Sequence, residues 1–200
     1  MRKYIWLTAL GAGLALAQPA QAPDPARYGF PQVVASVVLN PWDYLRLGLG
    51  HLVLTAPDQA FGQDPVRLEL LVGDPTYWQA YAPKGERVVY AFALRVTDLK
   101  TGERILRFAR PLHLSFYGEE IGEKAGYYDV TLTDPPQVSP NPVKPVIRVY
   151  RLGSRHQTGW LSHPLAGAAV GWLITRARTL GPAHRVGRVK EPALLQPGQG

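Results

Sequence analysis

Cysteine is absent from this 200-residue chain, and its absence excludes several kinds of chemistry at once. No disulfide can cross-link the fold, so stability must come from packing. A thiol nucleophile is impossible, and no cysteine follows the N-terminal segment to carry a lipid. Blue-copper and soft copper(I) sites need cysteine or methionine, and the only methionine is Met1. The sequence therefore predicts a protein that functions without thiol or thioether ligands.

Carboxylates are missing from a long stretch near the C-terminus, between Asp134 and Glu191. Residues 135–200 hold nine Lys or Arg against one acid, a net charge of +8, whereas residues 18–134 hold 11 against 14, a net charge of −3. Such an asymmetry predicts either a solvated face with a flexible tail or a surface for an anionic partner. On the second interpretation the contacts are arginines: Arg148, Arg151, Arg155, Arg176, Arg178, Arg185 and Arg188.

Several partners share the chemistry that such a surface would recognise. An anionic polymer of the cell envelope or another envelope protein fits best, lipid headgroups carry the same charge, and nucleic acid is less favoured. Within the chain, the acids of one predicted loop (Glu119, Glu120 and Glu123) are the obvious counterpart of the basic region. Their spacing lacks the Asp/Asn pattern of a calcium loop.

Catalytic motifs are also missing. None of the five serines lies in G-x-S-x-G or S-x-x-K. Ser154 with His156, or Ser162 with His163, lacks the oriented third group that a catalytic triad needs. The histidines show no metal-ligand spacing. We therefore expect no enzyme activity, no cofactor and no metal site.

What the chain does have, at its start, is the pattern of a secretory signal peptide in residues 1–17. Arg2 and Lys3 precede a 13-residue apolar stretch, and Ala15-Leu16-Ala17 is a small-x-small cleavage site. A second triplet ends at Ala22 but is followed by proline, which places the predicted cut after Ala17. The apolar stretch is too short to span a bilayer as a helix. We expect a soluble protein of the periplasm or the extracellular space, beginning at Gln18.

The remaining residues suit one domain of short strands separated by turns. Residues 18–31 are rich in proline and alanine and read as an extended lead-in, residues 32–180 as the domain, and residues 181–200 as a basic flexible tail. The predicted strands are residues 32–39, 44–55, 66–72, 87–97, 104–108, 112–117, 127–133 and 146–151. Turn chemistry at Asp98 and Gly102 predicts one hairpin, and the glycine-rich residues 118–126 predict a longer one.

Two segments are harder to assign. Residues 134–145 contain five prolines and cannot form a central strand. Residues 165–175 permit either a helix or a buried strand, and the β-rich surroundings favour a strand. Eight or nine short strands without a convincing long helix predict an all-β fold, an antiparallel β-sandwich.

Part of the chain resembles a known class of modules. The runs VVYAFALRVTDLKTGERILRF, PLHLSFYG and KAGYYDVTLTD, across about residues 86–134, look like bacterial immunoglobulin-like modules. In those modules a strand ends in an Asp-x-x-x-Gly turn and a late strand opens with glycine and tyrosine. The resemblance implies the sandwich fold and carries no ligand or activity with it.

Aromatic residues supply a second candidate site. Tyr77, Trp78 and Tyr81 lie in a proline-bounded connection, and Trp42 and Tyr44 lie in a similar turn. Loop aromatics either cap the open end of a core or stack on sugar rings or a protein partner. The sequence thus predicts an exported, non-enzymatic binding or scaffolding protein, with a carbohydrate-binding module as the alternative and an enzyme without a recognisable motif as a less favoured one.

Overall fold

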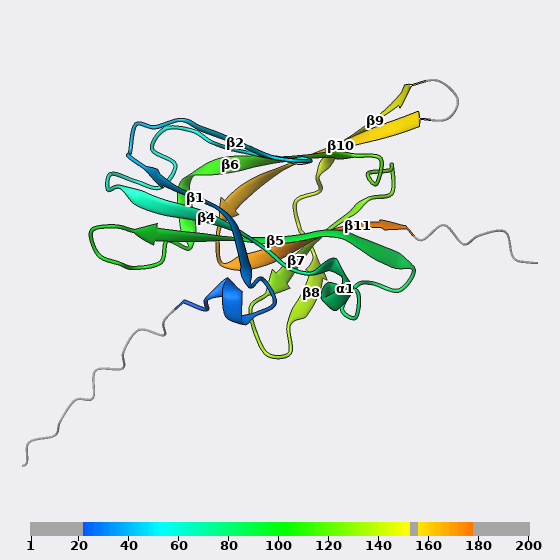
Figure 1. Cartoon of the computed structure of the whole chain (residues 1–200), viewed down its shortest axis with the longest axis horizontal. Helices are drawn as coiled ribbons and strands as arrows, with labels where there is room; N and C mark the ends of the chain where they lie inside the picture. Colours follow the sequence, from blue (N-terminus) through cyan, green and yellow to red (C-terminus); the bar gives the residue numbers. More distant parts are fainter. Residues whose placement is uncertain (1–21, 153–155, 178–200) are drawn as a thin grey trace, which may run out of the picture.

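The computed structural model describes residues 22–152 and 156–177, which form two antiparallel β-sheets packed face to face (Figure 1). The six-stranded sheet consists, in spatial order, of β1 (Gln32–Leu39), β4 (Val66–Val72), β5 (Glu86–Asp98), β11 (Val170–Ala177), β7 (Gly126–Thr131) and β8 (Gln137–Pro140). The five-stranded sheet consists of β2 (Leu45–Leu49), β3 (Leu52–Ala56), β6 (Arg107–Gly118), β10 (His156–Gly167) and β9 (Val146–Leu152). The all-β sandwich expected from the sequence is confirmed, with eleven strands in the described residues rather than eight or nine.

The main core lies between the two sheets, because alternate residues of each strand point inward. Phe92, Leu94 and Val96 of β5 face Leu112 and Leu114 of β6 across this core, and all five are fully buried. The outward residues of β6 are mostly polar, whereas several outward residues of β5 are apolar and buried. The alternation of the sequence thus identifies the inward face of β6, while β5 is buried on both faces over part of its length.

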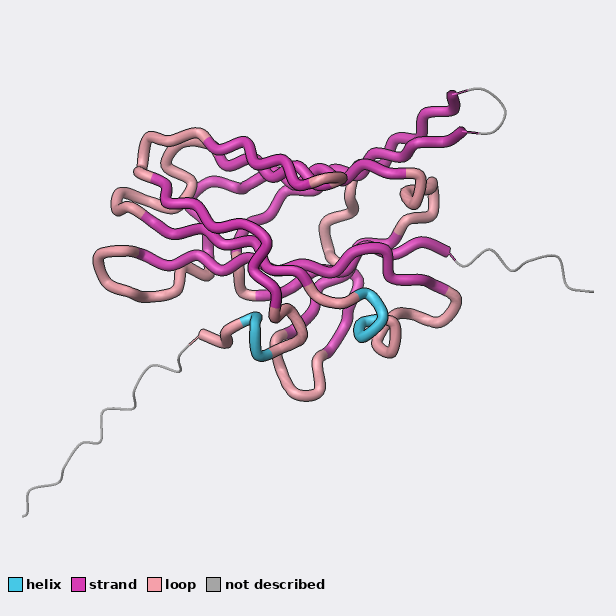
Figure 2. The backbone as a smooth tube through the Cα atoms, viewed as in Figure 1, coloured by secondary structure: helices cyan, strands magenta, loops and turns pink. Residues whose placement is uncertain are grey.

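A second apolar cluster covers the outer face of the six-stranded sheet. Phe30 and Trp78 lie over Ala91, Ala93 and Leu173 of this sheet, and all are buried. Figure 2 shows the two helical turns, η1 (Pro25–Arg27) and α1 (Pro75–Trp78), on this side of the molecule and no helix over the five-stranded sheet. The six-stranded sheet is therefore the middle layer of the domain over part of its area.

Several strands pair differently from the prediction. The segment 44–55 is a β2–β3 hairpin rather than one strand, since Gly50 adopts a φ of +57° at a turn. The turn at residues 98–103 forms as expected, but only Thr97 and Arg104 form a bridge before the chain crosses to the other sheet as β6. β6 and β7 also lie in different sheets, so residues 119–125 connect the sheets and do not close a hairpin.

The C-terminal strands complete both sheets. Residues 165–175 are neither one helix nor one strand: β10 ends at Gly167, and β11 begins at Val170 in the opposite sheet. β10, which the sequence did not predict, lies between β6 and β9, and β11 lies between β5 and β7. The proline-rich segment contributes only β8, a four-residue edge strand, in agreement with the expectation that it forms no central strand.

The described residues do not coincide with the predicted segments. The predicted signal peptide, residues 1–17, and the whole predicted basic tail, residues 181–200, lie outside them. The lead-in, predicted for residues 18–31, is part of the domain from residue 22 onward, because Pro25 and Phe30 are buried against the six-stranded sheet. No helix in the described part of the chain is long and apolar enough to cross a membrane.

Candidate functional site: the outer face of the five-stranded sheet

The five-stranded sheet contains no carboxylate in any of its strands. It holds five arginines: Arg46, Arg107, Arg110, Arg148 and Arg151. The strands of the six-stranded sheet hold four acids, Glu69, Glu86, Asp98 and Asp129, and four arginines, so their formal charge is balanced. The absence of carboxylates that the sequence showed at its C-terminal end thus extends, in space, over strands from the N-terminal half as well.

Arginine and aromatic side chains meet at one end of this sheet. Tyr117 of β6, Trp160 of β10 and Arg148 of β9 are neighbours in register on the outer face. The guanidinium carbon of Arg148 lies 5.1 Å from the centre of the Trp160 ring, within cation–π range. We call these three residues, with Val146 and Tyr150 of β9, the β9 face. Stacking on the indole orients Arg148 and leaves its N–H groups for a ligand.

The β9 face is open to solvent. Tyr117 is 42% exposed, Val146 is 54% exposed and Tyr150 is 51% exposed. Figure 1 shows the β9–β10 hairpin extending beyond the body of the sandwich. Large apolar side chains that stay this exposed beside a cation mark a contact surface more often than a structural one.

The structure separates the seven predicted anion contacts. Arg148 and Arg151 lie on β9, are exposed and form no ion pair with any described residue. Arg176 lies at the end of β11 in the other sheet, where Nη1 is 2.6 Å from Oε2 of Glu120, a carboxylate that also pairs with Arg87. Its charge is compensated within the chain, as expected for a counterpart of the 119–123 acids, so Arg176 does not contribute to the β9 face. The remaining four predicted contacts lie outside the described residues: Arg155, Arg178, Arg185 and Arg188.

The aromatic candidates are largely structural. Trp78 is fully buried: it stacks on Phe30 at 4.8 Å, and its Nε1 donates to the Gly29 carbonyl at 3.0 Å. The indole also lies so close to the backbone of Gly73 that a Cβ at this position would be 2.3 Å from Nε1. Trp78 therefore has no face for a ligand. Tyr77 and Tyr81 pack against it, and Tyr77 remains 46% exposed.

The turn before β2 presents the most exposed aromatic pair. Trp42 is 69% exposed and Tyr44 is 67% exposed. The turn is held by its own polar groups, because Asp43 accepts from the backbone and side-chain nitrogens of Asn40 at 2.7 and 3.1 Å. The turn presents two exposed rings at the end of the sandwich opposite α1, where the β1–β2 connection joins the sheets.

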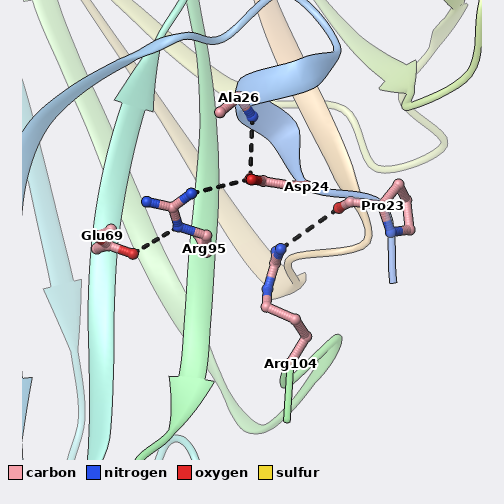
Figure 3. Close-up of polar contacts among 6 residues, drawn as sticks. All are labelled: Pro23, Asp24, Ala26, Glu69, Arg95 and Arg104. Atoms are coloured by element: carbon pink, nitrogen blue, oxygen red, sulfur yellow. Dashed lines mark hydrogen bonds and ion pairs between the residues drawn. The ribbon is translucent and has the colours of Figure 1, made fainter. Parts of the chain in front are cut away.

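A polar cluster fastens the N-terminal segment to the six-stranded sheet (Figure 3). Arg95 of β5 donates to Glu69 at 2.6 Å and to Asp24, the N-cap of η1, at 3.0 Å, and these two carboxylates raise the pKa of its guanidinium. Arg104 lies beside a cavity of about 340 Å³ that Arg95 also lines. Burial lowers the pKa of Arg104, and its Nε and Nη2 are enclosed without a hydrogen-bond partner among the described residues.

His163 is a histidine that the fold encloses. Its ring stacks on Tyr127 at 4.2 Å, and its Nε2 lies 2.9 Å from the Val143 carbonyl and 3.1 Å from Asn141 Oδ1. Both partners accept, so Nε2 carries the proton in the neutral ring. Burial lowers the pKa of His163. Ser162, its sequence neighbour, lies on the outer face, so the two do not form a nucleophile–base pair.

The sequence pointed to Arg148 of the β9 face, and to Arg151 on the opposite face of the same strand, but not to the other residues of the β9 face. Tyr117 and Trp160 come from strands 43 residues apart in the sequence and meet only through the β6–β10 pairing. The signal that could have pointed to them is that each is a large aromatic at an outward position of an alternating strand. In residues 22–152 and 156–177, no group of three or more His, Asp or Glu side chains is placed to hold a metal ion.

Comparison of the chain with protein-family models, with curated proteins and with solved structures found no match.

Proposed function

We propose that this protein is an exported, non-enzymatic binding protein of the periplasm or cell envelope that holds an anionic partner against the five-stranded sheet. The observation that carries the proposal is the complete lack of carboxylates in that sheet, together with the exposed Arg148 and Arg151 on its edge strand. Every charge that the partner meets on these strands is positive, and the basic C-terminal segment adds to it.

The strength of single contacts decides what kind of anion fits. An exposed ion pair contributes only about 0.2–1 kcal/mol, so one small anion on Arg148 would bind weakly. Several contacts on a single molecule add through effective concentration. The partner is accordingly a chain of negative charges, and Tyr117, Tyr150 and Trp160 provide apolar and stacking contacts beside them.

The test is the salt dependence of binding to a sulfated polysaccharide (heparin), measured by calorimetry or by retention on an immobilised column. We expect the affinity to fall at least about tenfold between roughly 50 and 200 mM salt. The double variant R148Q/R151Q should weaken low-salt binding and flatten the salt dependence, with a slope smaller in magnitude by about one for each arginine removed.

The matched control is R27Q/R67Q, which removes the same charge from exposed positions on the side of the six-stranded sheet. It should retain most of the binding. Equal losses in the two double variants would mean that only the net charge matters and that the five-stranded sheet is not the site. Salt-independent binding, or no binding, would overturn the proposal.

A second candidate function is carbohydrate binding, favoured by the exposed Trp42–Tyr44 pair rather than by Trp78. Two rings held on one turn are suited to stack on sugar faces. W42A should abolish retention on insoluble cell-wall glycan while the unfolding midpoint stays within the error of the wild type. Unchanged retention would exclude the turn as a sugar site.

A further inference from the structure

The outer edge of β9 is unpaired in the described structure. β9 is the last strand of the five-stranded sheet and bonds to β10 alone, through a continuous register from Val146–Ser162 to Leu152–His156. Its other edge therefore presents free backbone N–H and C=O groups. Such an edge is a template for a further strand.

The other three sheet edges of the domain are blunted in ways that β9 is not. β8 is four residues long and ends at Pro140, and β1 has a register shift between Val33 and Ala35. β2 is five residues long and contains Gly48. Short strands, prolines and bulges are the usual protection of edges. β9 has seven residues, VIRVYRL, with no proline, glycine or register shift, and it lies on the hairpin that projects from the sandwich (Figure 1).

The charges on β9 decide which strand fits beside it. Arg148 and Arg151 are an odd number of residues apart, so they lie on opposite faces of the strand and are both exposed. A second copy of β9 would bring its own two arginines onto the same ribbon without any carboxylate to offset them. An added strand with acidic residues would place a carboxylate beside each arginine.

We propose that β9 binds an extended acidic segment of a partner protein as an added strand. This inference rests on the proposed function and specifies its anionic partner as a polypeptide. Main-chain hydrogen bonds to the β9 edge hold the segment, two carboxylates three residues apart pair with Arg148 and Arg151, and apolar residues contact Val146 and Tyr150.

The experiment uses the full chain and a synthetic peptide of about nine residues, rich in Val and Thr, with two Glu three residues apart. Backbone amide hydrogen exchange is followed by NMR with and without the peptide. We expect the fast-exchanging amides of β9 to become protected, while those at the β8 and β1 edges do not change. R148Q/R151Q should weaken peptide binding by about tenfold or more.

A second peptide carries the same side chains with methylated interior amide nitrogens, so it keeps both carboxylates and loses the backbone donors. It should bind at least about tenfold more weakly. Equal binding of the two peptides would overturn strand addition, because charge alone would then explain the contact. Protection of β9 that rises with protein concentration and needs no peptide would identify a second copy as the occupant and would also overturn the inference.

The heparin measurement separates the two proposals. If heparin binds through Arg148 and Arg151 but the peptide does not bind, the polypeptide partner is wrong and the proposed function stands. If neither binds, the proposed function itself fails.

Discussion

The two sheets of this sandwich differ in what covers their outer faces. The six-stranded sheet is covered by η1, α1 and a second apolar cluster around Phe30 and Trp78, and its strands carry equal numbers of acids and arginines. The outer face of the five-stranded sheet has no such cover among the described residues, and its strands carry only positive charge. The six-stranded sheet is packed on both faces, and the five-stranded sheet leaves its outer face to solvent among the described residues. The proposed function assigns that open face to the partner and the covered sheet to stability.

The largest expected effect is loss of the outer apolar cluster. Replacing Trp78 with Ala removes a fully buried indole and its hydrogen bond to Gly29 and should lower the free energy of unfolding by about 3–5 kcal/mol. On the other sheet, Tyr150→Ala removes a ring that is 51% exposed. This variant should change the free energy of unfolding by less than about 0.5 kcal/mol. Denaturant unfolding measures both variants. Similar losses would show that the two outer faces are equally structural.

Replacing the arginines that hold the N-terminal segment, Arg95 and Arg104, should have a smaller effect on the free energy of unfolding. Arg95→Met leaves Glu69, whose side chain is only 15% exposed, without its partner and should cost about 2 kcal/mol. Arg104→Met removes two enclosed nitrogens, Nε and Nη2, that have no partner among the described residues, and loses one long hydrogen bond, from Nη1 to the Pro23 carbonyl at 3.5 Å. It should be neutral or stabilise the fold by about 1 kcal/mol. Thermal and denaturant unfolding would reveal the opposite signs. A loss for Arg104→Met as large as that for Arg95→Met would contradict this assignment.

At acid pH the domain should lose the stability that depends on neutral His163 of β10, in the five-stranded sheet. The folded pKa of His163 lies below its ordinary value of 6.5, because burial disfavours the charged ring. The contribution of the neutral His163 ring to the free energy of unfolding is present above pH 6.5. It is lost as the pH falls through the folded pKa of this residue. H163Q keeps an N–H donor without titrating, so its stability should change less between about pH 7 and 5 than that of the wild type. The exposed His113 supplies the control variant, H113Q, whose profile should follow the wild type.

At alkaline pH the stability of the domain should depend on Tyr128 of β7, in the six-stranded sheet. Burial and the hydrogen bond to Glu86 raise the pKa of Tyr128 from 10.0 to about 12. The unfolded chain releases this proton first, so stability is full below pH 10 and is lost between pH 10 and 12. Y128F should remove part of that loss, as measured by unfolding at the two ends of the range. Because the chain has ten tyrosines, the difference in phenolate absorbance between the wild type and Y128F isolates the titration of Tyr128.

Strand positions that are set by local chemistry could be predicted from the sequence. β1 and β4 have the predicted bounds, because proline precedes each and Asn40-Pro41 or Gly73 follows. β10 was not predicted because Gly159 and Pro164 interrupt its alternating apolar pattern. Each residue fits the strand because of what lies next to it. A Cβ at position 159 would lie 1.9 Å from the Ile121 carbonyl, and Pro164 lies beyond the part of β10 that pairs with β9.

The sheet to which each strand belongs could not be predicted. The same turn residues occur whether the two flanking strands pair with each other or join different sheets. Asp98 and Gly102 form the expected turn, yet β5 and β6 end in different sheets. For the same reason the sequence located the carboxylate-free region only along the chain. The arginine at position 46 shares a sheet with Arg148 through four strand pairings, none of which is visible in the order of residues.

The two strands at the C-terminal end of the described chain determine the order in which this protein can assemble. Without β10 and β11, the strands pair only as β1-β4-β5, β7-β8 and β2-β3-β6, and β9 has no partner. A growing polypeptide that stops before residue 156 thus has nine strands and neither complete sheet. Because the pairings of β10 and β11 are distant in sequence and form last, the polypeptide cannot complete either sheet until its synthesis has passed these strands. For a protein proposed to be exported, late closure of both sheets would keep the incomplete polypeptide unfolded until its last strands are made.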